Sequence, residues 1–99
     1  MILEAYEVKN TFEKVKGLIG EKKPQNLLLR TRWGIHTIGL KFPIDIVILD
    51  KEQIVAVLKE ALKPNNIFLW NPKYGIVLEL PAGTIKKEKI SKGKKIEIK

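Results

Sequence analysis

The sequence predicts a small, mostly β (α+β) domain with about seven short strands and one short N-terminal helix. Runs of β-branched residues recur along the chain, and glycines and prolines separate them. The 99 residues are 44% apolar, so the chain can fill one hydrophobic core and leaves little room for a second. No segment repeats, and only the lysine-rich C-terminus is compositionally biased. We therefore expect a single domain over residues 1–99.

The N-terminal part of the chain holds one predicted strand and the predicted helix. Apolar and polar residues alternate enough over residues 2–8 to indicate a strand. Asn10 and Glu13 then resemble a capping box, and apolar residues follow at helical spacing. These features predict a short amphipathic helix over residues 11–18, with its apolar side on the sheet.

The other strands are predicted from further β-branched runs between turn residues. We expect them at residues 26–30, 35–38, 44–49, 53–59, 75–80 and 95–98. Asp50, Lys51 and Glu52 form a polar connection between two of these runs. This connection predicts a β-hairpin over residues 44–59.

The net charge of +8 is concentrated at the C-terminus. Residues 84–99 carry seven lysines against two glutamates, hence +5, and the rest of the chain carries +3. A basic segment can attract phosphate-rich partners, but seventeen of the nineteen basic residues are lysines, whereas nucleic-acid readers usually rely on arginine. An excess of lysine, glutamate and isoleucine is also typical of hyperthermophile proteins, and we favour this interpretation of the charge over nucleic-acid binding.

Several classes of function are excluded by the composition. The chain has no cysteine and a single histidine, His36, which excludes disulfides, thiolate metal sites and multi-histidine metal sites. The only serine, Ser91, lies in no nucleophile elbow, and no phosphate-binding glycine loop is present. We expect no catalytic residue, no metal and no cofactor, so the sequence favours a binding domain over an enzyme.

The location of the protein is also predicted from its apolar runs. The longest of them are far shorter than the ~20 residues that span a bilayer. The N-terminus has acidic residues where a secretory signal has a basic end and an apolar run. We expect a cytoplasmic protein with no membrane partner.

Asp45 interrupts the apolar run I-D-I-V-I, where an unpaired ionised carboxylate is costly. It is therefore expected to have a partner nearby. The candidate partners are the backbone N–H groups of the loop at 39–42, the hydroxyl of Thr37, the imidazole of His36 and the amine of Lys41. One interpretation is structural, with Asp45 fixing the loop ahead of Pro43 through backbone hydrogen bonds. The other is functional, with Asp45 orienting His36 or binding a ligand.

Glu79 interrupts a second aliphatic run, V-L-E-L-P-A-G-T at residues 77–84. Strand alternation places it opposite its neighbours, so an exposed strand face is the simplest explanation. After it, Gly83 ends the strand and Thr84 can cap a single helical turn. The free N–H groups of that turn are suited to an anion.

The two tryptophans, Trp33 and Trp70, fall in segments expected to be loops or strand edges. They can form a stacking platform for a base or a sugar, or each can close one open end of the core. A positive rim surrounds such a platform only if the fold brings certain basic residues together. These residues are Arg30, Arg32, Lys41 and Lys63.

Three blocks of the sequence carry a family resemblance. They are I-H-T-I-G-L-K-F-P-I-D-I-V-I-L-D at 35–50, V-L-E-L-P-A-G at 77–83 and I-S-K-G-K at 90–94. The chain resembles the Domain of Unknown Function 192 family, also known as uncharacterised protein family 127. The resemblance implies a single-domain, barrel-like fold with an antiparallel or mixed sheet, and no established activity.

Individual residues match the pattern of that family. They are Gly17, Leu18, His36, Phe42, Pro43, Asp45, Asp50, Pro64, Glu79, Ala82, Gly83 and Gly93. Two positions depart from it: Leu40 stands where methionine is common, and Lys94 follows Gly93 where the family usually has aspartate. If that aspartate were part of a shared catalytic or metal site, this chain would lack it.

These observations predict a noncatalytic domain that binds an unidentified small ligand, in a pocket near residues 33–45 and 79–84. The expected ligand-binding residues are Trp33, His36, Thr37, Lys41, Asp45, Glu79 and Gly83. The alternative prediction is nucleic-acid binding through the basic C-terminal segment and exposed tryptophans.

Overall fold

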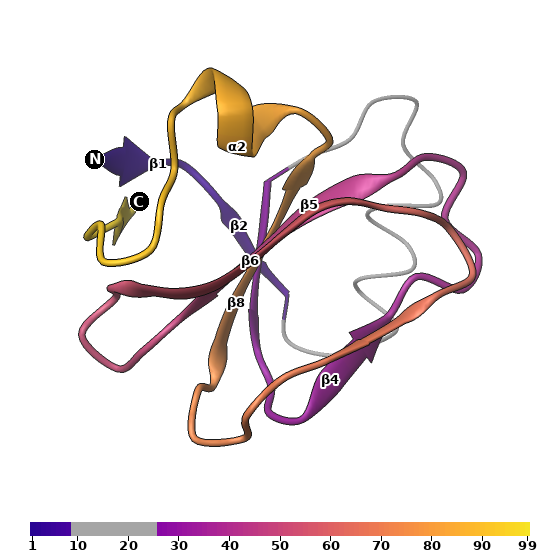
Figure 1. Ribbon diagram of the computed structural model, residues 1–99, viewed down its shortest axis with the longest axis horizontal. Coiled ribbons are helices and arrows are strands. Elements are labelled where there is room, and N and C mark those ends of the chain that lie inside the picture. Colours follow the sequence, from indigo (N-terminus) through magenta and orange to yellow (C-terminus); the bar gives the residue numbers. More distant parts are fainter. Residues whose placement is uncertain (9–25) are drawn as a thin grey trace.

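The computed structural model of the protein describes residues 1–8 and 26–99. The elements of these residues, shown in Figure 1, are β1 (Ile2–Leu3), β2 (Tyr6–Val8), β3 (Leu27–Arg30), β4 (Gly34–His36), β5 (Ile44–Leu49), β6 (Val55–Leu62), β7 (Ile67–Leu69), β8 (Ile76–Pro81), the short helix α2 (Thr84–Lys87) and β9 (Glu97–Ile98). The mostly β class is therefore confirmed. The helix predicted at 11–18 lies outside the described residues. None of the helices in the described ranges is long and apolar enough to cross a membrane.

Within residues 1–8 and 26–99, the main sheet has five strands in the order β2-β3-β8-β5-β6. Strands β2 and β3 run parallel, and the other neighbours are antiparallel, so the sheet is mixed. Two smaller ladders flank it, an antiparallel pair β4–β7 and a parallel pair β1–β9. The ladders of the described strands do not join into a closed ring, and a barrel is therefore not confirmed.

Both faces of the central sheet are buried, which explains the uninterrupted apolar run of β5. Ile44, Ile46 and Ile48 point into one hydrophobic cluster, which β4, β7 and Trp70 cover. The alternate residues Val47 and Leu49 point into a second cluster. That cluster is covered by β1, α2 and the C-terminal segment.

The predicted hairpin is confirmed as the antiparallel pair β5–β6. In its turn, Asp50 Oδ1 accepts hydrogen bonds from Glu52 N at 2.8 Å and Ile54 N at 3.0 Å. This is the behaviour that makes aspartate common in turns. Strand β6 continues to Leu62, three residues beyond the predicted end, after a register shift in the β5–β6 ladder.

Two other expectations need correction. The predicted strand over residues 2–8 is divided, because β1 pairs with β9 whereas β2 pairs with β3. Strand β7, with the sequence I-F-L, was not predicted. It has only three residues, too few to show a period, and it exists because β4 pairs with it.

The lysine-rich segment 84–99 is a packed part of the fold. Ile85, Ile90 and Ile96 belong to the second cluster and are at most 5% exposed. Backbone hydrogen bonds also join this segment to the start of β6, for example from Val55 N to the carbonyl of Lys94 at 2.9 Å. Most of its lysines are therefore exposed on a fixed backbone, while Lys94 is half-buried and donates from Nζ to the carbonyl of Lys89 at 3.4 Å.

Candidate functional site

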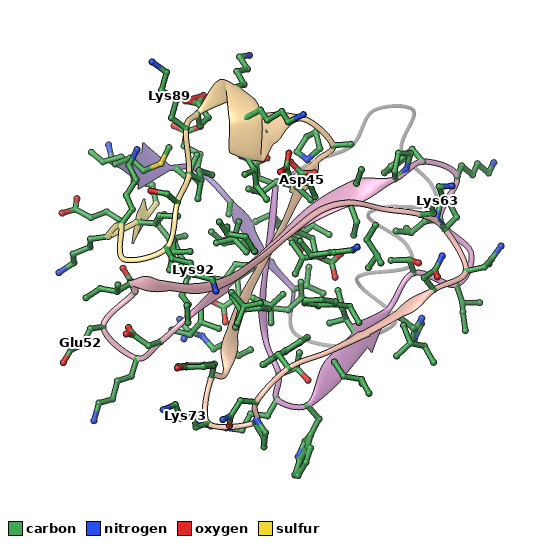
Figure 2. All side chains as sticks on the ribbon, in the orientation of Figure 1. Asp45, Glu52, Lys63, Lys73, Lys89 and Lys92 are labelled. Atoms are coloured by element: carbon green, nitrogen blue, oxygen red, sulfur yellow. The ribbon has the colours of Figure 1, made fainter. Side chains whose placement is uncertain are left out.

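Asp45 is fully buried in β5 and joins two other parts of the chain. Its Oδ1 accepts a hydrogen bond from Ala61 N in β6 at 2.9 Å. Its Oδ2 accepts hydrogen bonds from Gly83 N at 3.1 Å and Ile85 N at 2.9 Å. Figure 2 shows Asp45 beside α2. The carboxylate therefore acts as an internal anion for the first turn of this helix.

Asp45 accepts backbone hydrogen bonds, as the structural interpretation required, but it does not fix the loop ahead of Pro43, and the expected partners were wrong. None of its three hydrogen bonds goes to the loop at 39–42, to Thr37, to His36 or to Lys41. Gly83 has a left-handed backbone with φ 96°, which suits glycine and directs its N–H toward Asp45. A short helix begins at Thr84, but its N-cap is Gly83 and no side chain caps it, so Thr84 is not the predicted cap. The N–H groups of Gly83 and Ile85 already bind the protein's own carboxylate.

Glu79 was expected on an exposed face, and this expectation was wrong. Its side chain is 0% exposed, in the middle of β8. In the sheet it lies opposite Leu27 on one side and Ile46 on the other. Because β8 is the central strand of a sheet covered on both faces, alternation does not bring Glu79 to solvent.

Thr37 is fully buried and holds the connection between β6 and β7. Its hydroxyl donates to the carbonyl of Lys63 at 2.7 Å and accepts from Asn66 N at 2.9 Å. His36 is half-buried in β4, opposite Ile67 in the β4–β7 ladder, and Lys41 is exposed in the loop before β5. Thr37 therefore has a structural role.

The two tryptophans have different environments. Trp70 is 8% exposed, packs at a centroid distance of 6.1 Å from Phe68, and donates from Nε1 to the carbonyl of Tyr74 at 2.8 Å. It is a core residue. Trp33 is 69% exposed and has a left-handed backbone with φ 81°, which is unfavourable for a bulky side chain. Of the two, Trp33 is the one placed to stack with a ligand.

Trp33 borders an open cavity of about 720 Å³. The lining residues come from the end of β3, the β3–β4 connection, the β5–β6 turn, the β7–β8 connection and the start of β8: Arg30, Thr31, Arg32, Trp33, Lys51, Lys73, Gly75 and Ile76. We call this the Arg–Trp cavity. Among the described residues, its lining includes four cationic side chains and no acidic one. It is therefore suited to an anion.

The cations of the cavity are held to different degrees. Arg32 Nη1 donates to the carbonyls of Pro72 at 2.7 Å and Lys73 at 3.1 Å, which fixes the guanidinium without neutralising its charge. Arg30 Nε lies 3.2 Å from the carboxylate of Glu7, and both side chains are largely exposed. Lys51 lies in the β5–β6 turn. Arg32 is thus the most firmly positioned of the four.

Gly75 allows Arg32 to take this position. A Cβ at residue 75 would lie 3.2 Å from Cζ of Arg32, closer than a normal contact. The guanidinium therefore lies against a backbone that has no side chain at this point. This requirement could not be read from the sequence, because Arg32 and Gly75 are far apart in the chain.

The structure brings together only part of the predicted site. Arg30, Arg32 and Trp33 line one cavity, as the predicted positive rim requires, but Lys41 and Lys63 do not line it. Lys51 and Lys73 were not predicted as site residues, because in the sequence each resembles an ordinary surface lysine in a turn. Among residues 1–8 and 26–99, no group of three or more histidine, cysteine, aspartate or glutamate side chains is placed to hold a metal ion.

Comparison with known proteins gives a family and a fold. The model of the family DUF192, described as Uncharacterized ACR, matches residues 5–98. A protein of unknown function from Novosphingobium aromaticivorans has a similar structure, with a TM-score of 0.73 and 16% identity over 95% of this chain and 71% of that one. A "putative transcription regulator" from Sinorhizobium meliloti also has a TM-score of 0.73, with 20% identity over 93% of this chain and 76% of that one. A search of the curated proteins found no match.

Proposed function

The chain belongs to the DUF192 family, and we propose that it is a noncatalytic binding domain whose Arg–Trp cavity takes a phosphate-bearing ligand with a planar ring. The observation that carries the proposal is the combination of four cations and one exposed tryptophan around a single cavity. The Arg–Trp cavity differs from the pocket predicted near residues 33–45 and 79–84. Trp33 belongs to both sites.

The charge of the cavity supports a phosphate group. A guanidinium presents several N–H donors in a plane, which matches the oxygens of a phosphate. The two carbonyls that bind Nη1 of Arg32 hold the group in place before any ligand arrives, so less side-chain entropy is lost on binding. Lys51 and Lys73 add two further positive charges, and Nζ of Lys73 lies 5.2 Å from the centroid of the Tyr74 ring.

The conformation of Trp33 supports a planar ring. A left-handed backbone costs a residue other than glycine about 1–2 kcal/mol, and burial of the indole does not repay this cost because the side chain is 69% exposed. Strained residues of this kind gather at binding sites. The indole offers a flat apolar face for a base or another aromatic ring.

The size of the cavity agrees with such a ligand. Small-molecule sites usually enclose about 300–1,000 Å³, and the Arg–Trp cavity of about 720 Å³ falls in this range. Because the cavity is open to solvent, we expect a weak affinity, in the micromolar to millimolar range.

The test measures binding of the whole ligand, of its ring part alone and of its phosphate part alone. Amide NMR spectra of the protein are recorded with a nucleoside monophosphate, with the nucleoside alone, and with ribose 5-phosphate alone. We expect shifts at residues 30–33 and 73–76, and an affinity for the monophosphate at least about tenfold above that for either part. Arg32→Gln and Trp33→Ala should each weaken binding.

Two matched controls accompany these variants. Lys89→Gln removes a positive charge near α2, at the end of the molecule away from Lys73 (Figure 2). Tyr6→Ala removes another exposed aromatic ring, one that is 58% exposed on β2. Neither should change binding. The proposal is refuted if Lys89→Gln weakens binding as much as Arg32→Gln, or if the amides of the cavity do not shift at millimolar ligand.

A further inference from the structure

We propose that the ligand of the Arg–Trp cavity is a single-stranded nucleic acid that continues from the cavity along the outer face of the β4–β7 ladder. The inference rests on the proposed function, since it names the class of molecule that supplies the phosphate and the ring. It places the nucleic-acid surface on Trp33 and β4–β7, away from the lysine-rich C-terminal segment.

The outer face of the β4–β7 ladder is unusually apolar for a solvent-exposed surface. Ile67 is 66% exposed and Leu69 is 70% exposed, and both lie on the side of β7 away from the core. Their cross-strand partners are His36 and Gly34. We call these four residues the outer strip. The other side of the ladder carries Ile35 and Phe68, which pack in the first core cluster.

The outer strip is continuous with the cavity. Trp33 directly precedes Gly34, and its carbonyl accepts a hydrogen bond from Trp70 N at 3.0 Å, so it stays beside the end of β7. The side chain of Leu69 lies over Gly34, where a Cβ would collide with its Cδ2. The backbone of Trp33 therefore joins the cavity to the outer strip, in which Leu69 lies over Gly34 and Ile67 follows along β7.

Positive charge lies at both ends of the outer strip. Lys73 and Arg32 stand at the cavity end. At the other end Lys63 is exposed, and its carbonyl is bound by the hydroxyl of Thr37, the residue after β4. Figure 2 shows Lys73 and Lys63 on either side of this part of the molecule. In the part of the chain that the structure describes, no acidic residue belongs to the outer strip or to the lining of the cavity.

The dimensions favour a polymer over a single nucleotide. A strand advances about 3.3 Å per residue, so the path from Trp33 to Thr37 is roughly 13 Å long. That length accommodates at least two bases, with phosphates at the charged ends. Surfaces that bind single strands without strong sequence preference combine cations with aromatic side chains on which bases stack. Here Trp33 is the aromatic side chain, and Ile67 and Leu69 add aliphatic contact area. The net charge of +8 draws a polyanion to the protein.

The test compares ligands of increasing length. Binding of a labelled nucleoside monophosphate, a tetranucleotide and an octanucleotide is measured by NMR and fluorescence anisotropy at low and high salt. We expect the tetranucleotide to bind at least about tenfold more tightly than the monophosphate, with an affinity that falls as salt rises. A duplex of the same length should bind more weakly than the single strand, because its bases are not free to stack on Trp33.

Variants of the outer strip distinguish this inference from the proposed function. Ile67→Ser with Leu69→Ser should weaken tetranucleotide binding at least about fivefold and leave monophosphate binding unchanged. Ile2→Ser is the matched control, because Ile2 is 57% exposed on β1, outside the strip. Thermal unfolding of each variant confirms that it is folded.

Each contrary result has a defined meaning. Equal affinity for the monophosphate and the tetranucleotide refutes the polymer and leaves the proposed function standing. If neither binds, both proposals fail. If an acidic peptide of equal charge displaces the tetranucleotide at equal concentration, charge alone governs binding and the inference is overturned.

Discussion

Replacing Asp45 by asparagine tests whether this carboxylate is structural. Asparagine has nearly the same shape, but one of its two terminal atoms is an NH₂ group, which donates hydrogen bonds. The carboxylate accepts three backbone N–H groups, one at Oδ1 and two at Oδ2. In either orientation the introduced amide therefore places a donor against at least one backbone donor. The less costly orientation keeps the bonds from Gly83 and Ile85 and loses the one from Ala61.

The expected change in the free energy of unfolding follows from these hydrogen bonds. A hydrogen bond to a charged group contributes about 1.5–3 kcal/mol, and a neutral one about 0.5–1.5 kcal/mol. Asp45→Asn loses one charged bond and weakens two others, while burial of a neutral amide costs less than burial of a carboxylate. We expect a loss of about 2–4 kcal/mol in the free energy of unfolding. Asp45→Ala, which leaves all three N–H groups without this acceptor, should cost at least about 4 kcal/mol.

The assay is guanidinium unfolding followed by circular dichroism, with thermal unfolding as a second measure. For a domain of this size each 1 kcal/mol lowers the Tm by about 4–8 °C. Asp50→Asn is the matched control. Asp50 accepts both of its backbone hydrogen bonds at one oxygen, Oδ1, so the carbonyl oxygen of asparagine can replace it. We expect this control to cost less than about 1 kcal/mol.

One result would refute the reasoning about Asp45. If Asp45→Asn unfolds at the same denaturant concentration as Asp50→Asn, the three hydrogen bonds do not stabilise the fold as argued. If it also remains folded but no longer binds the nucleoside monophosphate, Asp45 acts on the ligand, and the functional interpretation drawn from the sequence is correct.

Three further predictions follow from burial and backbone geometry. Trp70→Ala should lower the free energy of unfolding by about 3–5 kcal/mol, whereas Trp33→Ala should change it by less than about 1 kcal/mol; denaturant unfolding measures both. Gly34→Ala should displace β4 from β7, because its Cβ would lie 2.9 Å from the backbone carbonyl oxygen of Phe68, and amide exchange in the β4–β7 ladder should become faster. Deletion of residues 90–99 should unfold the domain, since it removes two buried isoleucines and β9, and a folded truncated protein in circular dichroism would contradict this.

A strand was predictable where a run of apolar residues between turn residues marks it in the sequence. β5 was predicted over 44–49 with its observed bounds, because a run rich in β-branched residues lies between Pro43 and the Asp50 turn. β7 was missed because three residues cannot show a pattern, and its pairing with β4 joins residues about thirty apart. The lysine-rich C-terminus was taken for a basic segment because its buried isoleucines are irregularly spaced.

The partners of Asp45 and the burial of Glu79 could not be predicted from the neighbouring residues in the sequence. The rule that Asp45 must have partners was correct, and it follows from the cost of burying a charge. The identity of those partners was wrong, since Gly83 and Ile85 approach Asp45 only because β8 pairs with β5. Glu79 was placed on the surface by alternation, which holds only when one face of a sheet meets water.

The hydrogen bonds of Asp45 indicate that the residues carrying the family resemblance and the residues of the candidate ligand site have different roles. Asp45 lies in the first block of that resemblance, at 35–50, and Gly83 ends the second, at 77–83. A single carboxylate therefore connects the two blocks in space, so these residues are accounted for by the fold. The lining of the Arg–Trp cavity lies between and before the blocks, at Arg30–Trp33, Lys51 and Lys73. The residues of the two blocks that Asp45 joins therefore serve the fold, whereas the proposed ligand site rests on side chains outside both blocks.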